Sequence, residues 1–411
     1  MKRALPPAAF LALALSGCGL LQRQPLFLVT DRAEVASYVE YFNASGPDLR
    51  VVLRYREEPA EALTRNGGAD LVVGRDLSGF AAARSLDSLE DLFRYGRLRR
   101  QDFYASILAR GAPEHRQVLL PLSFSIPAVL FLPYNLRETV PNLALSLDYL
   151  RTQGGQYNQS VRGSLVRLGF SPLWDSGFLF LAAELRGARF HEDAGGGLGW
   201  NENGLRDAVA YLREWVAATK GGAEAEEAFR VKYLYQPLGR LLDEKRILFY
   251  LDASGELLRA LEDQKEEADF RWLAGPEKIF VNEDILFAGI PRASGRKKQA
   301  REFLAWLFQQ ETQKQLLENG RRQRLGFFGI AGGFSGLKSV NEREFPQYYP
   351  RLIGRIPPEE LLYIPGPLPP GWRQLKSQVL LPWLRQAAVS SGEPADLAGE
   401  VRDFKSGRLR K

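Results

Sequence analysis

The stretch QVLLPLSFSIPAVLFLPYNL, Gln117–Leu136, decides the predicted fold of this chain. Its two apolar runs, Val118–Leu120 and Ala128–Leu132, have the length of buried strands. They are separated by Pro121 and Pro127, and proline is disfavoured inside a central strand because it has no backbone N–H to donate. We therefore expect one strand to end at the first proline and another to begin near the second.

The link between the two prolines, Leu122–Ile126, is short and carries Ser123 and Ser125. We interpret it as a hinge at which the chain leaves one sheet and enters another. Pro133 then ends the second strand, and Tyr134-Asn135 opens a turn. Taken alone, the stretch is equally consistent with a buried linker whose prolines stand at strand ends.

The start of the chain has the features of an export signal. A basic Met1-Lys2-Arg3 precedes an apolar run, Ala8–Leu15, which is shorter than the roughly 20 residues of a membrane span. Leu15-Ser16-Gly17-Cys18 resembles the lipobox of bacterial lipoproteins, and Cys18 is the only cysteine of the chain. We predict a signal peptide over 1–17, lipidation of Cys18 and a tether over 18–24. The alternative is an ordinary secretory signal with an incidental cysteine.

Length and composition indicate a two-domain globular protein. A chain of 411 residues is too long for one hydrophobic core. Its 45% apolar and 25% charged residues are typical of globular domains. The formal net charge of +6 partly reflects a basic C-terminal end, which we interpret as solvated. No nucleic-acid-binding motif accompanies that charge, so we expect no nucleic acid partner.

The first part of the mature chain has a βαβαβ pattern. We predict strands at Leu26–Val29, Leu49–Tyr55 and Leu71–Val73. The helix between the first two strands is predicted from an apolar stripe of Val35, Tyr38, Val39 and Phe42.

Charged residues follow the first and third of these strands. Parallel strands place their carboxyl ends along one edge of the sheet, where ligands bind in open α/β sheets. Asp31, Arg75 and Asp76 fall at that edge and are candidate ligand contacts. Taken singly, Asp31 is more readily explained as a helix cap, or Thr30 in its place, and Asp76 as a turn residue.

The second part of the chain supplies aromatic candidates. A strand predicted at Arg246–Leu251 contains Tyr250 and ends at Asp252. Aromatic faces stack on the C–H surfaces of sugars, although an aromatic residue at an element boundary more often packs in the core. The candidates for such a stacking face are Trp174, Trp200, Tyr250 and Trp372.

The order of strand, proline, polar crossing, apolar strand and Tyr134-Asn135 resembles the first interlobe crossing of extracellular solute-binding proteins of ABC importers, family 1. Pro291–Leu317 resembles the segment in which these proteins carry a serine, then an "A..F" and "L" helix pattern and a second helix. Ala253-Ser254 stands where the family carries a glycine-tryptophan pair, which leaves solutes other than sugars open.

This resemblance implies an α/β, two-lobe periplasmic binding protein-like fold of type II, with a mixed sheet and flanking helices in each lobe. The first lobe would comprise 25–124 and 284–326, and the second 125–283 and 327–411. Three crossings would form the hinge between them.

The resemblance also implies function. A monomeric lipoprotein, facing the periplasm or the cell exterior, would capture a small solute between its lobes and deliver it to the permease subunits of an ABC importer. A sugar or oligosaccharide is the favoured solute. The predicted ligand-binding residues are Asp31, Arg75, Asp76, Ser123, Ser125, Trp174, Tyr250 and Asp252.

Catalytic motifs are missing from the sequence. Its two histidines, His115 and His191, stand in no metal-binding spacing, and the chain has no zinc-protease or serine-hydrolase motif. We therefore expect no enzyme activity, no metal and no cofactor. Two alternatives stay open: a secreted enzyme such as a glycosidase, which needs only a carboxylate pair, and a binding lipoprotein that serves sensing instead of transport.

Overall fold

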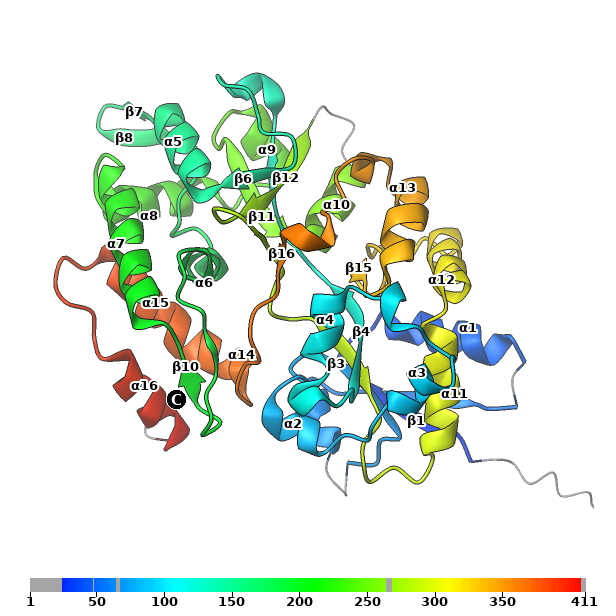
Figure 1. Ribbon diagram of the computed structural model, residues 1–411. Helices are drawn as coiled ribbons and strands as arrows, with labels where there is room; N and C mark the ends of the chain where they lie inside the picture. The colour runs from blue at the N-terminus through cyan, green and yellow to red at the C-terminus, as the bar shows by residue number, and fades with distance from the viewer. Residues whose placement is uncertain (1–23, 47, 64–66, 264–267, 408–411) are drawn as a thin grey trace, which may run out of the picture.

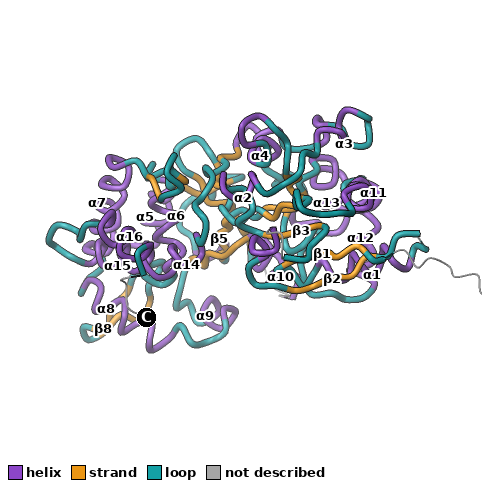
Figure 2. Tube along the Cα trace, turned by 90° about the horizontal axis from the view of Figure 1, so that it is seen from below, coloured by secondary structure: helices purple, strands orange, loops and turns teal. Residues whose placement is uncertain are grey.

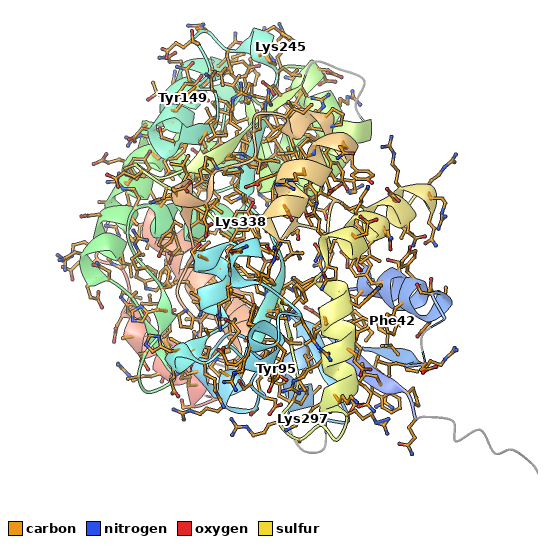
Figure 3. The ribbon with its side chains drawn as sticks, turned by 45° about the vertical axis from the view of Figure 1, so that its right-hand side comes forward. Phe42, Tyr95, Tyr149, Lys245, Lys297 and Lys338 are labelled. Atoms are coloured by element: carbon orange, nitrogen blue, oxygen red, sulfur yellow. The ribbon has the colours of Figure 1, made fainter. Side chains whose placement is uncertain are left out.

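The computed structural model describes residues 24–46, 48–63, 67–263 and 268–407. The predicted signal peptide and Cys18 lie outside the described residues. Figure 1 shows two lobes, each built on its own sheet with helices around it. Figure 3 places Tyr149 and Lys245 at one end of the molecule and Lys297 at the other.

The first sheet has the strand order β15-β4-β14-β3-β1-β2. Strands β1, β2 and β3 are parallel to one another, and β14, β4 and β15 join by antiparallel pairing. The strands are β1 Leu26–Thr30, β2 Val51–Tyr55, β3 Leu71–Gly74, β4 Leu119–Phe124, β14 Leu286–Gly289 and β15 Phe334–Ser335. The helices of this lobe are α1 Val35–Ala44, α2 Phe80–Arg84, α3 Glu90–Arg94, α4 Ala105–Arg110, α11 Lys297–Leu307, α12 Gln310–Arg322 and α13 Phe345–Tyr348.

The second sheet has the order β11-β5-β12-β13-β16, and β6 pairs with β12. In Figure 2, β5 lies near the middle of the molecule, between helices α5, α7 and α15 and strands β1 and β3. The strands are β5 Pro127–Phe131, β6 Ala144–Ser146, β11 Phe249–Ala253, β12 Asp269–Ala274, β13 Ile279–Phe280 and β16 Leu362–Tyr363, with the separate pairs β7 Gln159–Val161 with β8 Ser164–Arg167 and β9 His191–Glu192 with β10 Leu198–Gly199. The helices are α5 Leu147–Tyr157, α6 Ser176–Leu185, α7 Glu202–Ala218, α8 Gly222–Tyr233, α9 Leu238–Asp243, α10 Ser254–Asp263, α14 Trp372–Leu375, α15 Leu381–Val389 and α16 Leu397–Lys405.

The predicted apolar stripe of α1 is confirmed. Its four members, from Val35 to Phe42, are all buried. The Phe42 ring packs edge-on against Phe303 and Trp306 of α11, with ring centroids 5.0 and 4.8 Å apart. Burial of such a face, and not helix propensity, supplies most of the stability of a surface helix.

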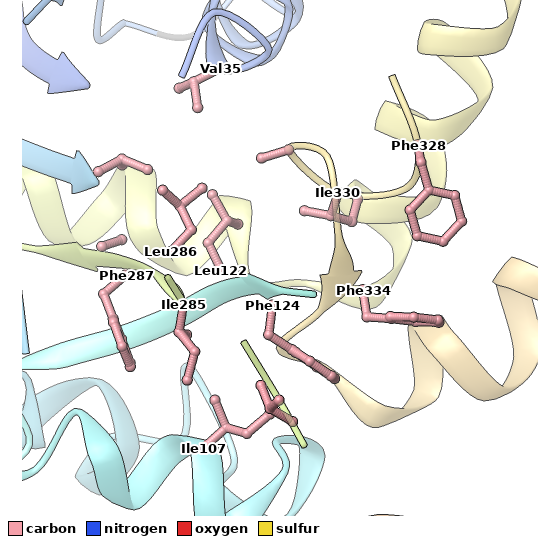
Figure 4. Close-up of a cluster of buried hydrophobic side chains, with 14 of the residues drawn as sticks. Val35, Ile107, Leu122, Phe124, Ile285, Leu286, Phe287, Phe328, Ile330 and Phe334 are labelled. Atoms are coloured by element: carbon pink, nitrogen blue, oxygen red, sulfur yellow. The ribbon is translucent and has the colours of Figure 1, made fainter. Parts of the chain in front are cut away.

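The hydrophobic core that includes this helix face continues around β4, β14 and β15. Figure 4 shows Phe124 and Phe334 with their rings close together, and Ile330 and Phe328 above them. The Phe124 and Phe334 centroids are 5.8 Å apart in a stacked arrangement. These contacts pack the carboxyl end of β4 against β15, next to the first crossing between the sheets.

The expectation that Pro121 breaks a strand is wrong. Pro121 lies inside β4, a strand with neighbours on both sides. The register of β14 shifts between Leu286 and Phe287, opposite Ser123 and Pro121, and such an irregularity lets a strand contain a residue without an N–H. Because β4 continues to Phe124, the first crossing between the sheets is only Ser125-Ile126. Pro127 begins β5, as predicted.

The last return to the second sheet comes later than the predicted boundary at residues 326–327. Phe334–Ser335 pairs with β4 and is still part of the first sheet. The glycines of this segment serve close packing: a Cβ at Gly333 or Gly336 would collide with the backbone carbonyl of Phe124 or Pro121. The next paired strand of the second sheet is β16, so the return lies after α13. Figure 3 shows Lys338 near the middle of the molecule, where it forms an ion pair with Glu359 at 3.1 Å.

Within the described ranges, the structure has no helix that is long and apolar enough to cross a membrane.

Candidate functional site

A cavity of about 360 Å³ lies between the two lobes. Arg75 and Asp76, in the loop after β3, contribute from the first lobe. Asn282, Glu283 and Asp284 contribute from the second crossing of the chain. The rest of the wall comes from the second lobe, through Pro127, Asp175, Gly177, Phe180, Leu181, Leu251, Asp252, Ala253, Phe280, Trp372, Arg373, Lys376, Ser377 and Leu381.

Three aromatic side chains are among the residues that line this cavity. They are Phe180 of α6, Phe280 of β13 and Trp372 of α14. The Trp372 and Phe180 rings are in contact, with centroids 5.5 Å apart. Trp372 is buried, and its indole N–H has no hydrogen-bond partner in the described structure. A face of this kind is suited to pack against the C–H surface of a ring-shaped ligand.

A network of arginines and aspartates joins the lobes at the edge of the cavity. The Arg373 Nε of α14 donates to Asp76 Oδ2 at 2.6 Å, and its Nη2 donates to Asp31 Oδ2 at 3.2 Å. Arg75 Nε also donates to Asp31 Oδ2, at 2.8 Å. The Asp31 side chain is only 1% exposed, so these two guanidinium groups compensate the cost of burying its charge.

The structure distinguishes the roles that were considered for Asp31 and Asp76, namely helix cap or turn residue against ligand contact. The capping interpretation of Asp31 is wrong, because α1 begins after Glu34 and has no side-chain cap. The Thr30 hydroxyl accepts a hydrogen bond from the N–H of Arg32, which lies before the helix, so Thr30 does not cap it either. Asp76 does lie in a turn, with a φ of 59°, and it also faces the cavity. A left-handed backbone is tolerated at aspartate better than at most residues.

Further polar contacts hold the lobes together. Lys376, which directly follows α14, pairs with Glu283 of the second crossing, and its Nζ lies 4.2 Å from the centroid of the Phe180 ring. Glu192 of β9 accepts a hydrogen bond at 2.7 Å from the backbone N–H of Phe80 in the first lobe. The structure therefore represents a state in which the two lobes are in contact around the cavity.

Asp252 presents a carboxylate to the cavity from the end of β11. It accepts hydrogen bonds from the backbone N–H of Ala253 at 2.7 Å and from the Tyr250 hydroxyl at 3.2 Å. Burial raises the pKa of the Asp252 carboxyl, and the neighbouring Glu256 and Asp175 raise it further. Burial also raises the pKa of Tyr250 to about 12, so this hydroxyl stays a donor. In the described structure, neither Asp252 nor Asp175 forms an ion pair.

Comparison with solved structures identifies the architecture. The sugar-binding protein MalE of Xanthomonas citri superposes with a TM-score of 0.69 at 12% identity, covering 93% of this chain and 96% of that one. MalE of Listeria monocytogenes in complex with maltose gives 0.64 at 14% identity, with 94% and 99% coverage. The cyclic α-maltosyl-1,6-maltose binding protein of Arthrobacter globiformis gives 0.61 at 14% identity, with 94% and 98% coverage.

The chain has the two-lobe fold of ABC solute-binding proteins. This confirms the fold class expected from the sequence. No family model and no curated protein matches the sequence. At these identities the likeness shows the fold alone.

The two-lobe fold brings several of the predicted site residues together. Arg75, Asp76 and Asp252 line the cavity between the lobes, and Asp31 lies behind the two arginines. Ser123 and Ser125 lie beside a separate cavity of about 40 Å³, which Arg75 and Asp284 also line. The Ser125 hydroxyl accepts a hydrogen bond from the Asn282 side chain at 2.8 Å, which links the first two crossings of the hinge.

Of the aromatic residues proposed as a stacking face, some line the cavity and others lie elsewhere. Trp372 lines the cavity, whereas Trp174 stacks on Phe229 with a centroid distance of 6.0 Å and lies outside it. Tyr250 lies behind Asp252 and orients its carboxylate. Trp200 lies beside another surface hollow of the second lobe, next to α7 and α16.

Sequence reasoning missed much of the cavity wall. Arg373 and Lys376 follow Trp372 at helical spacing, but nothing in the sequence indicates that this helix docks against the first lobe. Phe180 lies in a run of apolar residues, and nothing in that run indicates which side chain meets the cleft. The other charged or aromatic lining residues that were missed are Asp175, Phe280, Glu283 and Asp284.

The described residues contain no group of three or more His, Cys, Asp or Glu side chains that could hold a metal ion.

Proposed function

We propose that this protein is an extracytoplasmic binding protein of an ABC importer, which captures a small saccharide between its lobes and delivers it to the permease. The observation that carries the proposal is the composition of the interlobe cavity. Three aromatic side chains line it, together with carboxylates and cationic groups from both lobes. Proteins with this fold that are named for binding maltose and other saccharides support the choice of ligand.

The mechanism follows from the position of the cavity. A ligand held there contacts both lobes only while they are closed, so it stabilises the closed state over the open one. Rotation would take place at the three crossings. We place the first at Ser125-Ile126, the second at 281–285 and the third between α13 and β16. The first lobe would thus comprise 25–124 and 284–348, which extends the lobe predicted from the sequence.

A ligand screen tests this proposal. We expect maltose, mannobiose or a related saccharide to raise the melting temperature of the purified protein, because a ligand that binds only the folded state stabilises it by mass action. Amino acids, polyamines and inorganic anions serve as comparison ligands. A saccharide that stabilises the protein should also make it more compact in small-angle scattering. Stabilisation by one of the comparison ligands alone would contradict a saccharide-binding role.

Asp252→Asn is expected to weaken binding of the saccharide found in this screen about tenfold or more. A hydrogen bond to a charged group contributes roughly 1.5–3 kcal/mol, and the amide removes that charge. The melting temperature should stay the same or rise, because the variant no longer buries a carboxylate without a cationic partner. Calorimetric titration measures the affinity. Unchanged affinity would show that Asp252 makes no contact with the ligand.

We also propose that Cys18 carries the lipid that attaches the protein to a bacterial membrane. Cys18→Ala is expected to abolish incorporation of labelled fatty acid and to release the protein from the membrane fraction, because stable anchoring requires the acyl chains. Fractionation of cells that express each form measures the effect. Ser16→Ala, which keeps a small residue beside the cysteine, is the matched control and should remain in the membrane fraction.

A further inference from the structure

A second cavity, of about 350 Å³, adjoins the cavity described above and shares Arg373 with it. Arg75, Asp76 and Arg373 line both cavities. The second cavity is also bounded by both lobes. Its wall includes Glu58, Pro59, Ala60, Leu63, Gly79, Ala81, Ala82 and Ser85 from the first lobe and Leu368, Pro370, Gly371 and Gln374 from the second.

We propose that Arg373 is a specificity-determining residue that divides one long interlobe cleft into two, and thereby limits the ligand to the length that fills the first cavity. This inference rests on the proposed saccharide-binding function. Ligand pockets usually have volumes of about 300–1,000 Å³, so each cavity alone is at the small end of that range. The two together would hold a correspondingly longer chain of sugar units.

The contacts of Arg373 explain how it divides the cleft. Its guanidinium bridges Asp76 and Asp31 of the first lobe, and Nη2 also donates to the backbone carbonyl of Glu57 at 3.2 Å. The side chain therefore extends from α14 across the gap to the opposite lobe. A forked guanidinium held by three acceptors is a well-defined barrier, because few rotamers satisfy all of them.

Removing this barrier should leave the rest of the site in place. Asp31, the most buried member of the network, keeps its 2.8 Å hydrogen bond from Arg75. The Arg373 side chain is 38% exposed, and ion pairs at that exposure add little to stability. Asp76 is itself 23% exposed and would be hydrated after the change.

The second cavity has a surface that fits a further sugar unit. Pro59, Ala60, Ala82 and Pro370 supply apolar contact, while Glu58 and Gln374 supply polar groups. Gln374 Nε2 donates to Glu58 Oε1 at 2.9 Å, so these two side chains close the gap between the lobes on that side. Such a mixture of apolar faces and a few placed polar groups is typical of ligand sites.

The experiment compares chain-length dependence in Arg373→Ala and the parent protein. Maltose, maltotriose and maltotetraose, and in parallel mannobiose and mannotriose, are titrated by calorimetry. In the parent we expect no gain in affinity beyond the length that fills the first cavity. In Arg373→Ala we expect the longest saccharide of the series that binds to have about tenfold higher affinity than the shortest. Arg402→Ala is the matched control and should follow the parent. It removes an exposed arginine of α16 whose ion pair, among the described residues, is with Asp396.

Arg373→Gln is the second variant, and it keeps the test valid if the alanine variant does not fold. It should show the same gain in affinity for the longest saccharide. A crystal structure of either variant with maltotetraose should place sugar units on both sides of position 373. If affinity depends on saccharide length in the same way in the parent and in both variants, Arg373 does not divide the cleft, although the protein still binds saccharides. Failure of every saccharide to bind the parent would overturn both.

Discussion

Trp372→Ala is expected to lower the free energy of unfolding by about 3–5 kcal/mol, as truncation of a large buried aromatic does. The Trp372 side chain is 2% exposed and packs on Phe180, at the point where α14 joins the second lobe. Its loss leaves a cavity beside the cleft and also removes part of its aromatic lining. Urea denaturation followed by circular dichroism measures the change.

Two control variants separate packing from binding. Tyr235→Ala truncates an aromatic side chain that is 78% exposed, and it should change the free energy of unfolding by less than about 0.5 kcal/mol. Trp372→Phe retains most of the packing but presents a smaller face to the cleft. We expect it to lose affinity for the saccharide while keeping most of the stability. A Trp372→Ala protein as stable as the parent would show that this ring does not pack as the structure indicates.

The second large effect is a dependence of stability on pH that comes from Glu184. This side chain of α6 is 2% exposed, and burial raises its pKa to about 7. Its Oε1 accepts a hydrogen bond from the backbone N–H of Phe190 at 2.7 Å, which lowers the pKa in part. Glu283 raises the pKa further, whereas Arg189 and Lys376 lower it. The remaining oxygen, Oε2, has no partner in the described structure.

The sign of this effect follows from proton linkage. The carboxyl has its ordinary pKa in the unfolded chain and a higher one in the folded protein, so the folded state holds the proton more tightly. The contribution to stability is therefore fully present at low pH and is lost as the pH rises through about 7. Between pH 5 and pH 8 the loss amounts to about 2–3 kcal/mol.

Glu184→Gln removes this titration while keeping the shape of the side chain. We expect the free energy of unfolding of the parent to fall more steeply between pH 5 and pH 8 than that of the variant, by the amount given above. Urea denaturation at a series of pH values measures both curves. Curves that run parallel over this range would mean that Glu184 has an ordinary pKa in the folded protein.

Local features were predictable because their causes lie within a few residues. The stripe from Val35 to Phe42 specifies one buried helix face at a period of 3.6 residues. Asn201 accepts a hydrogen bond from the N–H of Gly204 at 3.0 Å and caps α7, as an asparagine before an apolar helical stripe is expected to do. Pro133 ends β5 and opens a turn, as a residue with no N–H and a restricted φ should.

Where the chain leaves a sheet was harder to predict. Pro121 was expected to end a strand, but a shift of register in the neighbouring β14 accommodates it. The segment after Gly329 falls within 327–411, which was expected to belong to the second lobe, but it packs closely on β4 instead. In both cases the deciding partner is a strand far away in the sequence, and pairing of that kind leaves no local periodicity.

The sequence alone determined the buried face of α1, the start of β5 at Pro127 and the strand-end segments in which Asp76 and Asp252 stand, because these depend on local apolar periodicity and on the breaks that proline and glycine impose. Only the tertiary structure decided what those residues meet. Asp31 and Arg373 are 342 positions apart, and their contact exists because α14 docks across the cleft. Docking depends on the shape of both lobes, so the composition of the cavity wall follows from packing between distant segments and not from any motif.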